Sequence, residues 1–439
     1  MLTAVALAMP ALAQDAAPQP GQPVEVSVTG GTNAPSVIAV PVFAPAAEAQ
    51  TTGGSTSAIG QQIAQVIASD LRSTGKFNPV GPDGIPAVGY AEAPRPSYAR
   101  WTSVGASTLL TGFVEARQDG RLTVGCYLFD LTGQSELTHQ GYAVDPTQWR
   151  QAAHKCSDMA YSRLTGNQAY LDTRVVYVAE TGPKDNRVKR IAIMDADGSN
   201  QRFLTGGNRT VITPRFSPDG SQLVYTSYIG RKPRVILLNT DNLTERLLIP
   251  GDHISFAPRF SPDGRQVVFS MAQNGNTDLY SVSLSGGAPR RLTVTPGADT
   301  AASYSPDGRK IVFESDRSGT QQLYVMNADG SDQRRISFGG GRYASPAWSP
   351  KGDLIAFTKI GAGFRIGVMS PSGGGEKLLT DAWDDEQPSW APNGQFVMFN
   401  RISQGSGASR LYAVSVDGGD PRLLPTPTGG SDPSWSPLN

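Results

Sequence analysis

The sequence has little of the side-chain chemistry that most enzymes need. It contains two cysteines and three histidines, and His139, His154 and His253 lie in separate segments. No G-x-S-x-G nucleophile elbow is present, and no glycine-rich phosphate-binding fingerprint follows a predicted strand. So few ligands are also a poor basis for a zinc site. We therefore predict no catalytic residues, no metal site and no cofactor, and a structural role for His154.

The chain also lacks a surplus of charge of either sign. Lys and Arg number 38, Asp and Glu also number 38, and only 17% of the residues are charged. Nucleic-acid-binding proteins usually have a basic surplus, so we expect no nucleic-acid partner. After the N-terminus, no apolar run approaches the roughly 20 residues that span a bilayer, so we expect no insertion into a membrane.

The N-terminus reads MLTAVALAMPALAQ, an apolar run that ends in a small-x-small cleavage pattern. It is too short to span a bilayer, and it lacks the basic residues that usually open an export signal. The pattern favours a truncated signal peptide at residues 1–13 over an ordinary apolar N-terminus. A flexible leader rich in Pro, Gln and Ala follows at 14–24. We expect the mature protein outside the cytoplasm.

Residues 25–166 alternate between strand-like and helix-like patterns, which predicts a small α/β (α+β) domain. Apolar residues at helical spacing predict helices over 58–71 and from Asp145 to Gly166, where Asp-Pro and Gly are typical helix ends. Alternating or apolar runs of strand length occupy 36–43, 108–117, 121–131 and 136–144. We expect the last three to pair as antiparallel strands.

The two cysteines belong to this domain. Cys126 lies in a predicted strand and Cys156 in the last predicted helix. They can form a disulfide if the strand and the helix pack face to face. Two separately buried thiols are the alternative, and the sequence leaves both open.

A repeat begins after a linker at 167–173 and fills residues 174–439. PRFSPDG occurs at 214–220 and again at 258–264, and four varied copies follow. The motif prolines are 44, 44, 44, 42 and 45 residues apart: Pro218, Pro262, Pro306, Pro350, Pro392 and Pro437. With the short strands between copies, each repeat has the size of a four-stranded propeller blade. The sequence therefore predicts a six-bladed β-propeller.

The repeated S-P-D-G letters have a structural explanation. Pro fixes φ, Asp can bind the local backbone and Gly accepts a positive φ, so each copy is predicted to form the turn between a blade's first two strands. The first blade-like strand (174–180) has no motif before it, and the last motif (433–437) has no strand after it. We therefore expect the C-terminal strand to close the ring as the innermost strand of the first blade.

MDADGSN (194–200) is faintly similar to a calcium-binding loop. An EF-hand needs glutamate at position 12 counted from Asp195, where this chain has Gly206. We interpret the segment as a turn between two strands.

The residues just before each motif differ between blades, although the strands repeat. They begin the innermost strands and should ring one mouth of the channel, which we call the pre-motif mouth: 211–213, 253–257, 299–301, 342–345, 384–387 and 430–432. Variable loops on a repeated scaffold commonly carry recognition, so this mouth is the candidate binding surface. Solvated loops without a partner are the alternative.

These features resemble the TolB family, periplasmic proteins of the Tol-Pal cell-envelope system of Gram-negative bacteria. The resemblance rests on IASDLRSTGKFNPV (67–80), GASTLLTGFVE (105–115), HKCSDMAYSRLTGNQAYLDTRVVYVAE (154–180) and the six repeats ending in PSWSP. It implies an α/β domain packed on a six-bladed propeller. It also implies a non-enzymatic periplasmic protein that supports outer-membrane integrity and constriction during cell division.

The resemblance further implies two protein partners, with colicins exploiting the site of the first. The lipoprotein Pal is expected at the pre-motif mouth, where family positions correspond to His253, Ala257 and Thr300; Ile212, Ala301 and Tyr343 complete the candidate set. TolA is expected at the N-terminal segment, for which Val24, Glu25 and Val26 are the candidates.

Two other functions remain open at this point. A periplasmic propeller hydrolase or lactonase would need acidic or histidine ligands that converge on a metal at one mouth. A propeller that binds a small molecule or glycan would need exposed aromatic side chains there, for which Tyr343 is the one clear candidate.

Overall fold

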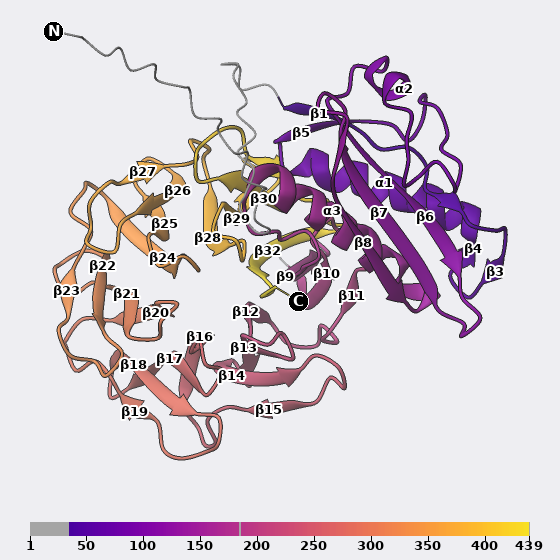
Figure 1. Ribbon diagram of the computed structural model, residues 1–439. Helices are drawn as coiled ribbons and strands as arrows, with labels where there is room; N and C mark the ends of the chain where they lie inside the picture. The colour runs from indigo at the N-terminus through magenta and orange to yellow at the C-terminus, as the bar shows by residue number, and fades with distance from the viewer. Residues whose placement is uncertain (1–34, 184–185, 439) are drawn as a thin grey trace, which may run out of the picture. The chain divides into compact units, whose positions relative to one another are not determined.

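The computed structural model describes residues 35–183 and 186–438 (Figure 1). Residues 36–439 form one compact unit. The predicted signal peptide (1–13), the leader (14–24) and the TolA candidates Val24, Glu25 and Val26 lie outside the described residues. Among the helices that are described, none combines the length and the apolar character required to cross a membrane.

The α/β domain is built on one mixed sheet. Its strands are β1 (Ser36–Ala39), β2 (Ala44–Pro45), β5 (Phe77–Val80), β6 (Thr108–Ala116), β7 (Leu122–Asp130) and β8 (Ser135–Val144), and β3 (Gln50–Thr51) with β4 (Gly54–Ser55) forms a separate short hairpin. The order is β5-β1-β6-β7-β8, with β2 also paired to β6. β1 is parallel to both neighbours, whereas β6, β7 and β8 are antiparallel as predicted. The sequence interpretation missed β5, a short strand that contains a proline.

Two long helices pack against this sheet and against each other. They are α1 (Thr56–Ser73) and α3 (Trp149–Thr165); the short helices are α2 (Tyr98–Thr102) and the 3-10 turn η1 (Pro146–Gln148). The Ser55 hydroxyl caps α1 by accepting the Ala58 N–H at 3.2 Å. Asp145 caps η1 through the Thr147 N–H, and Gly166 ends α3 at a φ of 69°. Both predicted helices are therefore present. Gly166 ends α3 as predicted, whereas Asp145 opens the 3-10 turn before α3 and the Ser55 cap of α1 was not predicted.

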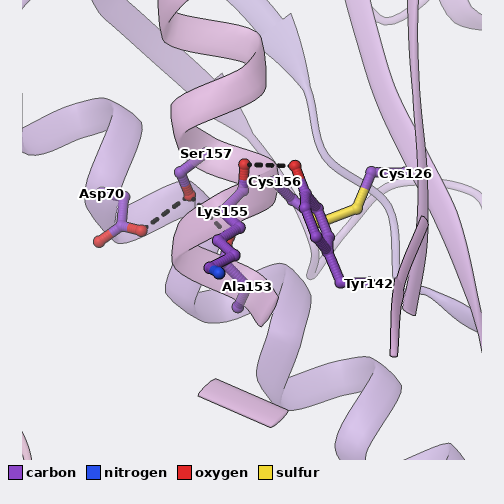
Figure 2. Close-up of a disulfide and its surroundings, with 7 residues drawn as sticks. All are labelled: Asp70, Cys126, Tyr142, Ala153, Lys155, Cys156 and Ser157. Atoms are coloured by element: carbon purple, nitrogen blue, oxygen red, sulfur yellow. Dashed lines mark hydrogen bonds between the residues drawn. A yellow bond between two sulfur atoms is a disulfide. The ribbon is translucent and has the colours of Figure 1, made fainter. Parts of the chain in front are cut away.

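A disulfide joins β7 to α3 inside this domain. Cys126 and Cys156 are both fully buried, and their sulfur atoms are bonded (Figure 2). Tyr142 of β8 lies beside the bridge and donates its hydroxyl to the Lys155 carbonyl of α3 at 3.2 Å. The strand and the helix thus pack face to face. This packing was the condition for a disulfide between Cys126 and Cys156, and the disulfide is formed.

The propeller consists of six four-stranded sheets. The blades are, in chain order: β9 (Arg174–Thr181), β10 (Val188–Asp195) and β11 (Arg202–Phe203) with β32 (Gly429–Trp435); β12 (Val211–Phe216), β13 (Gln222–Ile229), β14 (Lys232–Asn239) and β15 (Glu245–Leu247); β16 (Ile254–Phe260), β17 (Gln266–Gln273), β18 (Asn276–Ser283) and β19 (Arg290–Arg291); β20 (Asp299–Tyr304), β21 (Lys310–Ser315), β22 (Gln322–Asn327) and β23 (Arg334–Arg335); β24 (Arg342–Trp348), β25 (Ile355–Ile360), β26 (Phe364–Met369) and β27 (Lys377–Leu378); β28 (Asp385–Trp390), β29 (Phe396–Ile402), β30 (Ser409–Ser415) and β31 (Arg422–Leu423).

The C-terminal strand closes the ring. β32 pairs antiparallel with β9 and takes the innermost place in the first blade, beside the last blade's β28 and β29 (Figure 1). The prediction of a six-bladed propeller closed by the C-terminal strand is confirmed.

Each S-P-D-G segment forms the predicted turn between a blade's first two strands. In the first copy the Ser217 N–H donates to the Gln222 carbonyl at 2.8 Å, and the Ser217 hydroxyl donates to Asp219 at 2.5 Å. Gly220 has a φ of 70°, a conformation that favours glycine. The same contacts recur at Ser261 and Ser305. The repeated letters therefore encode a self-contained turn.

The aromatic residue before each turn packs between blades. Phe216 shares a core with Val176 of the first blade, and Phe260 shares one with Val224 of the second. Trp390 donates its Nε1–H to the Ala347 carbonyl of the preceding blade at 2.8 Å. These side chains supply the apolar contacts between blades.

The α/β domain is tied to the propeller by contacts from α3 and the linker. Tyr161 donates its hydroxyl to Gln395 at 2.7 Å, and Asn393 donates to the Gln168 carbonyl at 3.2 Å. Asp158 of α3 accepts three backbone N–H groups of the linker, from Tyr170, Leu171 and Asp172. One half-buried carboxylate thereby fixes the path of the chain between the two domains.

Candidate functional site

The pre-motif mouth is shaped by a β-bulge that recurs in every blade. The register between the first two strands shifts at the residue before the motif, and that residue has a positive φ although none of the six is glycine. They are Thr213 (53°), Ala257 (50°), Ala301 (52°), Ser345 (50°), Gln387 (57°) and Asp432 (51°). Such residues are uncommon, and bulges re-aim side chains, so the fold displays one residue per blade at the channel.

Hydrogen bonds between blades hold these bulges in place. The Ala257 N–H donates to Thr226 Oγ1 of the preceding blade at 3.1 Å, and the Ser345 N–H donates to Glu314 Oε2 at 2.7 Å. In the closing blade the Asp432 N–H donates to Asn400 Oδ1 at 3.3 Å. The three acceptor residues lie on the second strand of the preceding blade, where each pairs with the residue directly before that blade's bulge. Three of the six bulges are therefore tied to the preceding blade by a backbone hydrogen bond.

The structure brings four of the predicted Pal-contacting residues to equivalent positions of this ring. Ala257 and Ala301 are bulge residues, while Ile212 and Thr300 directly precede a bulge. Thr300 Oγ1 donates to Glu314 Oε1 at 2.6 Å, which orients its methyl group. His253 is partly exposed and directly precedes β16, at the same mouth.

Tyr343 requires a correction, because it is not an exposed aromatic side chain. Its relative exposure is 0%, and its ring packs against Phe357 in the core between blades. Its hydroxyl donates to Glu376 at 2.7 Å, and the Lys359 ammonium lies 5.1 Å from the ring centroid. Tyr343 is thus a packing residue, which removes the one aromatic candidate for a small-molecule or glycan site.

Other exposed apolar side chains lie on the loops that lead into the innermost strands. Val294, Phe338 and Trp383 are 72%, 71% and 58% exposed, and each lies between the last strand of one blade and the first strand of the next. By chain direction these loops border the pre-motif mouth. The sequence interpretation missed them, although an aromatic residue in a Gly- or Asp-rich loop is a signal that could have been used. Exposed apolar side chains of this kind mark interaction surfaces.

Carboxylates near the channel give the mouth an acidic character. Burial, followed by the negative charges of Asp384 and Asp432, raises the pKa of Glu386 to about 7. Burial also raises the pKa of Asp432 and of Glu314, despite the hydrogen bonds that Glu314 accepts from Thr300 and Ser345. The site can therefore change its charge near neutral pH.

A second polar cluster links the two domains. Asp70 of α1, His154 of α3 and Asp197, in the turn after β10, form the group of three potential metal ligands found among the described residues. His154 Nδ1 lies 2.8 Å from Asp70 Oδ2, and its Nε2 lies 4.0 Å from Asp197 Oδ2. Arg150 also binds Asp197, and Ser157 binds Asp70.

Charge in this cluster is balanced by the histidine itself. Burial lowers the pKa of His154, but Asp70, with Asp197 and Asp195, more than offsets burial and raises the pKa to about 9. The cluster is therefore an ion-paired joint between α1, α3 and the first blade, which agrees with the structural role predicted for His154.

Both domains of the chain match domains of known proteins. The TolB amino-terminal domain matches residues 24–137, and the TolB beta propeller domain matches residues 161–439. The chain belongs to the TolB family. The Tol-Pal system protein TolB of Rhizorhabdus wittichii is 62% identical and covers 99% of both chains. That of Sphingopyxis alaskensis is 61% identical over 100% of this chain and 98% of its own length.

A solved TolB structure has the same fold as this family member. TolB from Acinetobacter baumannii superposes with a TM-score of 0.78 at 26% identity, over 92% of this chain and 97% of that one. At this coverage the match includes both the α/β domain and the propeller.

Proposed function

We propose that this chain is a non-enzymatic periplasmic component of the Tol-Pal system that binds the lipoprotein Pal through the pre-motif mouth. Through this contact it would support outer-membrane integrity and constriction during cell division. The observation that carries the proposal is the bulge ring, in which six equivalent positions of a repeated scaffold hold five different residue types. The names of the relatives, Tol-Pal system proteins, support membership of that system.

The chemistry of the mouth supports a protein partner. Small side chains at Ala257 and Ala301 leave the ring open, and exposed apolar side chains at Val294, Phe338 and Trp383 border it. Exposed apolar side chains beside the mouth favour a protein partner, because exposed apolar patches mark interaction surfaces.

A charged side chain at the mouth tests this proposal. We expect Ala257→Arg to weaken binding of Pal lacking its lipid anchor by about tenfold to a hundredfold, as loss of a central contact does. Gln387 occupies the equivalent position with a φ of 57°, so a long side chain is compatible with the fold. Surface plasmon resonance measures the dissociation constant.

The matched control adds the same charge in the turn of the preceding blade, away from the pre-motif mouth. Ser221→Arg places arginine where the equivalent turns already have Arg265 and Arg309. We expect this variant to bind Pal as the wild type does. Equal affinity of Ala257→Arg and wild type would refute the proposed surface.

For the second partner, we propose that Val24, Glu25 and Val26 contact TolA. The assignment rests on the family alone. Deleting residues 14–31 should abolish capture of TolA while leaving the disulfide and the propeller intact. A deletion variant that still binds TolA with unchanged affinity would show that the contact lies elsewhere.

A further inference from the structure

The other end of the channel, formed by the motif segments, encloses a cavity of about 420 Å³. Its lining comes from all six blades and consists mainly of the last residues of the innermost strands and the turns that follow. Each innermost strand runs from the pre-motif mouth to this cavity. The cavity and the proposed Pal surface therefore lie at opposite ends of the same strands. We call the end of the channel that contains the cavity the motif end.

Two arginines of neighbouring blades line the cavity. Arg215 and Arg259 occupy the same position in the two identical PRFSPDG copies. Burial lowers the pKa of Arg215 to about 10, and Asp432 offsets part of this effect. Burial, with the positive charge of Arg215, lowers the pKa of Arg259 well below its ordinary range. Arg215 is buried and Arg259 is half-buried, and their positive charges repel each other.

Nearby protein groups leave most of this charge without a partner. Arg215 Nη1 donates to the carbonyls of Pro214 at 2.7 Å and Pro433 at 3.4 Å. Within residues 35–183 and 186–438, neither arginine forms a salt bridge, Arg259 has no hydrogen-bond partner, and no carboxylate lines the cavity. Removing a guanidinium from water is costly unless its donors find partners, so the unused donors of Arg215 and Arg259 are available to a ligand.

The fold itself does not require arginine here. Ser303 and Ser389 occupy the position in two other blades, where their hydroxyls accept the N–H groups of Trp348 and Trp435, both at 3.2 Å. Another blade has Ala347. Serine ties neighbouring blades together at this position, whereas Arg215 and Arg259 offer positive charge instead. The arginines are therefore better explained by binding than by packing.

We propose that the motif end is an oxyanion-binding site, in which Arg215 and Arg259 hold the carboxylate or phosphate group of a small organic ligand. The planar fork of guanidinium matches either group through paired, charge-assisted hydrogen bonds. The aromatic and proline residues in the lining accommodate an apolar body attached to the charged group. This site is separate from the pre-motif mouth and does not depend on Pal binding.

Calorimetric titration of the full chain with phenyl phosphate and, separately, benzoate tests the proposal, with sodium chloride at matched ionic strength as the blank. We expect the wild type to bind at least one probe and Arg259→Ser to weaken that binding by about tenfold, the value of one lost charge-assisted hydrogen bond. Binding of only one probe supports the proposal and fixes the class of oxyanion. Because Ser303 is the native residue at the equivalent position, Arg259→Ser should fold.

Arg246→Gln is the matched control, since Arg246 lies exposed on β15 of the same propeller. It should bind the probes as the wild type does, and the double variant Arg215→Gln, Arg259→Ser should not bind them. Thermal melting is the second measurement: the bound probe should raise the Tm of the wild type but not that of the double variant. Failure of both probes to bind the wild type, or equal binding by wild type and double variant, overturns the proposal.

Discussion

Replacement of His154 by glutamine should remove a pH-dependent part of the protein's stability. His154 is buried between Asp70 and Asp197, and its pKa is raised to about 9 from an ordinary value of 6.5. Because the folded pKa is the higher one, the protonated form stabilises the folded state. This stabilisation is fully present below about pH 6.5 and is lost as the pH rises through about 9.

The magnitude follows from the two pKa values. Their difference corresponds to about 3 kcal/mol of unfolding free energy between about pH 6 and about pH 10. His154→Gln cannot gain a proton, so its unfolding free energy should lack this pH-dependent part. Gln can still donate one neutral hydrogen bond to Asp70, which limits the loss at low pH.

Urea unfolding at both pH values, followed by tryptophan fluorescence, measures the effect. His139→Gln is the matched control, because His139 lies on β8 with 64% of its side chain exposed. That variant should keep the pH dependence of the wild type, including the part that lysines and tyrosines contribute. If His154→Gln shows the same pH dependence as the wild type, the ion-paired joint does not exist as described.

Three further predictions concern other buried groups. Burial raises the pKa of Glu386 to about 7 from 4.5, so the wild type should lose stability relative to Glu386→Gln as the pH rises from about 4.5 to 7. Allowing for the partial exposure of Glu386, urea unfolding at about pH 8 should show the variant to be about 1–2 kcal/mol more stable than the wild type. A less stable variant would contradict this prediction. Replacing Cys126 and Cys156, 30 residues apart, by serine should lower the unfolding free energy by about 3–4 kcal/mol in the chain-entropy model, whereas an unchanged denaturant midpoint would argue against a formed bridge. Asp158→Ala leaves the linker N–H groups without their acceptor and should speed their hydrogen exchange by about tenfold or more; unchanged exchange at Leu171 would refute that role.

The propeller was predictable because each blade contains a local turn motif that recurs at a nearly constant spacing in the sequence. Each S-P-D-G copy makes its own hydrogen bonds, so the turn can be inferred without knowledge of the rest of the chain. The unmatched first strand and last motif likewise point to ring closure, which the pairing of β32 with β9 confirms. The strands β6 to β8 and the helices α1 and α3 were also predictable from their periodicity and end signals.

The details of the site depend on contacts between distant segments and were not predictable. Nothing about Thr213 or Gln387 indicates a positive φ, because neither residue type favours the left-handed region and the bulge is defined by pairing with the next strand. The sequence predicts an exposed Tyr343 because the contacts that bury it, with Phe357 and Glu376, come from other segments of the chain. Asp70 and His154 lie 84 residues apart, so their contact leaves no local pattern in a single sequence.

Hydrogen exchange of the wild-type chain with and without Pal tests the central claim most directly. Binding at the pre-motif mouth should slow exchange in peptides that contain 211–213, 253–257 and 299–301. Peptides that contain the turns at 217–221 and 261–265 should exchange at the same rate in both states. Protection confined to the turns, or to the α/β domain, would contradict the proposed surface.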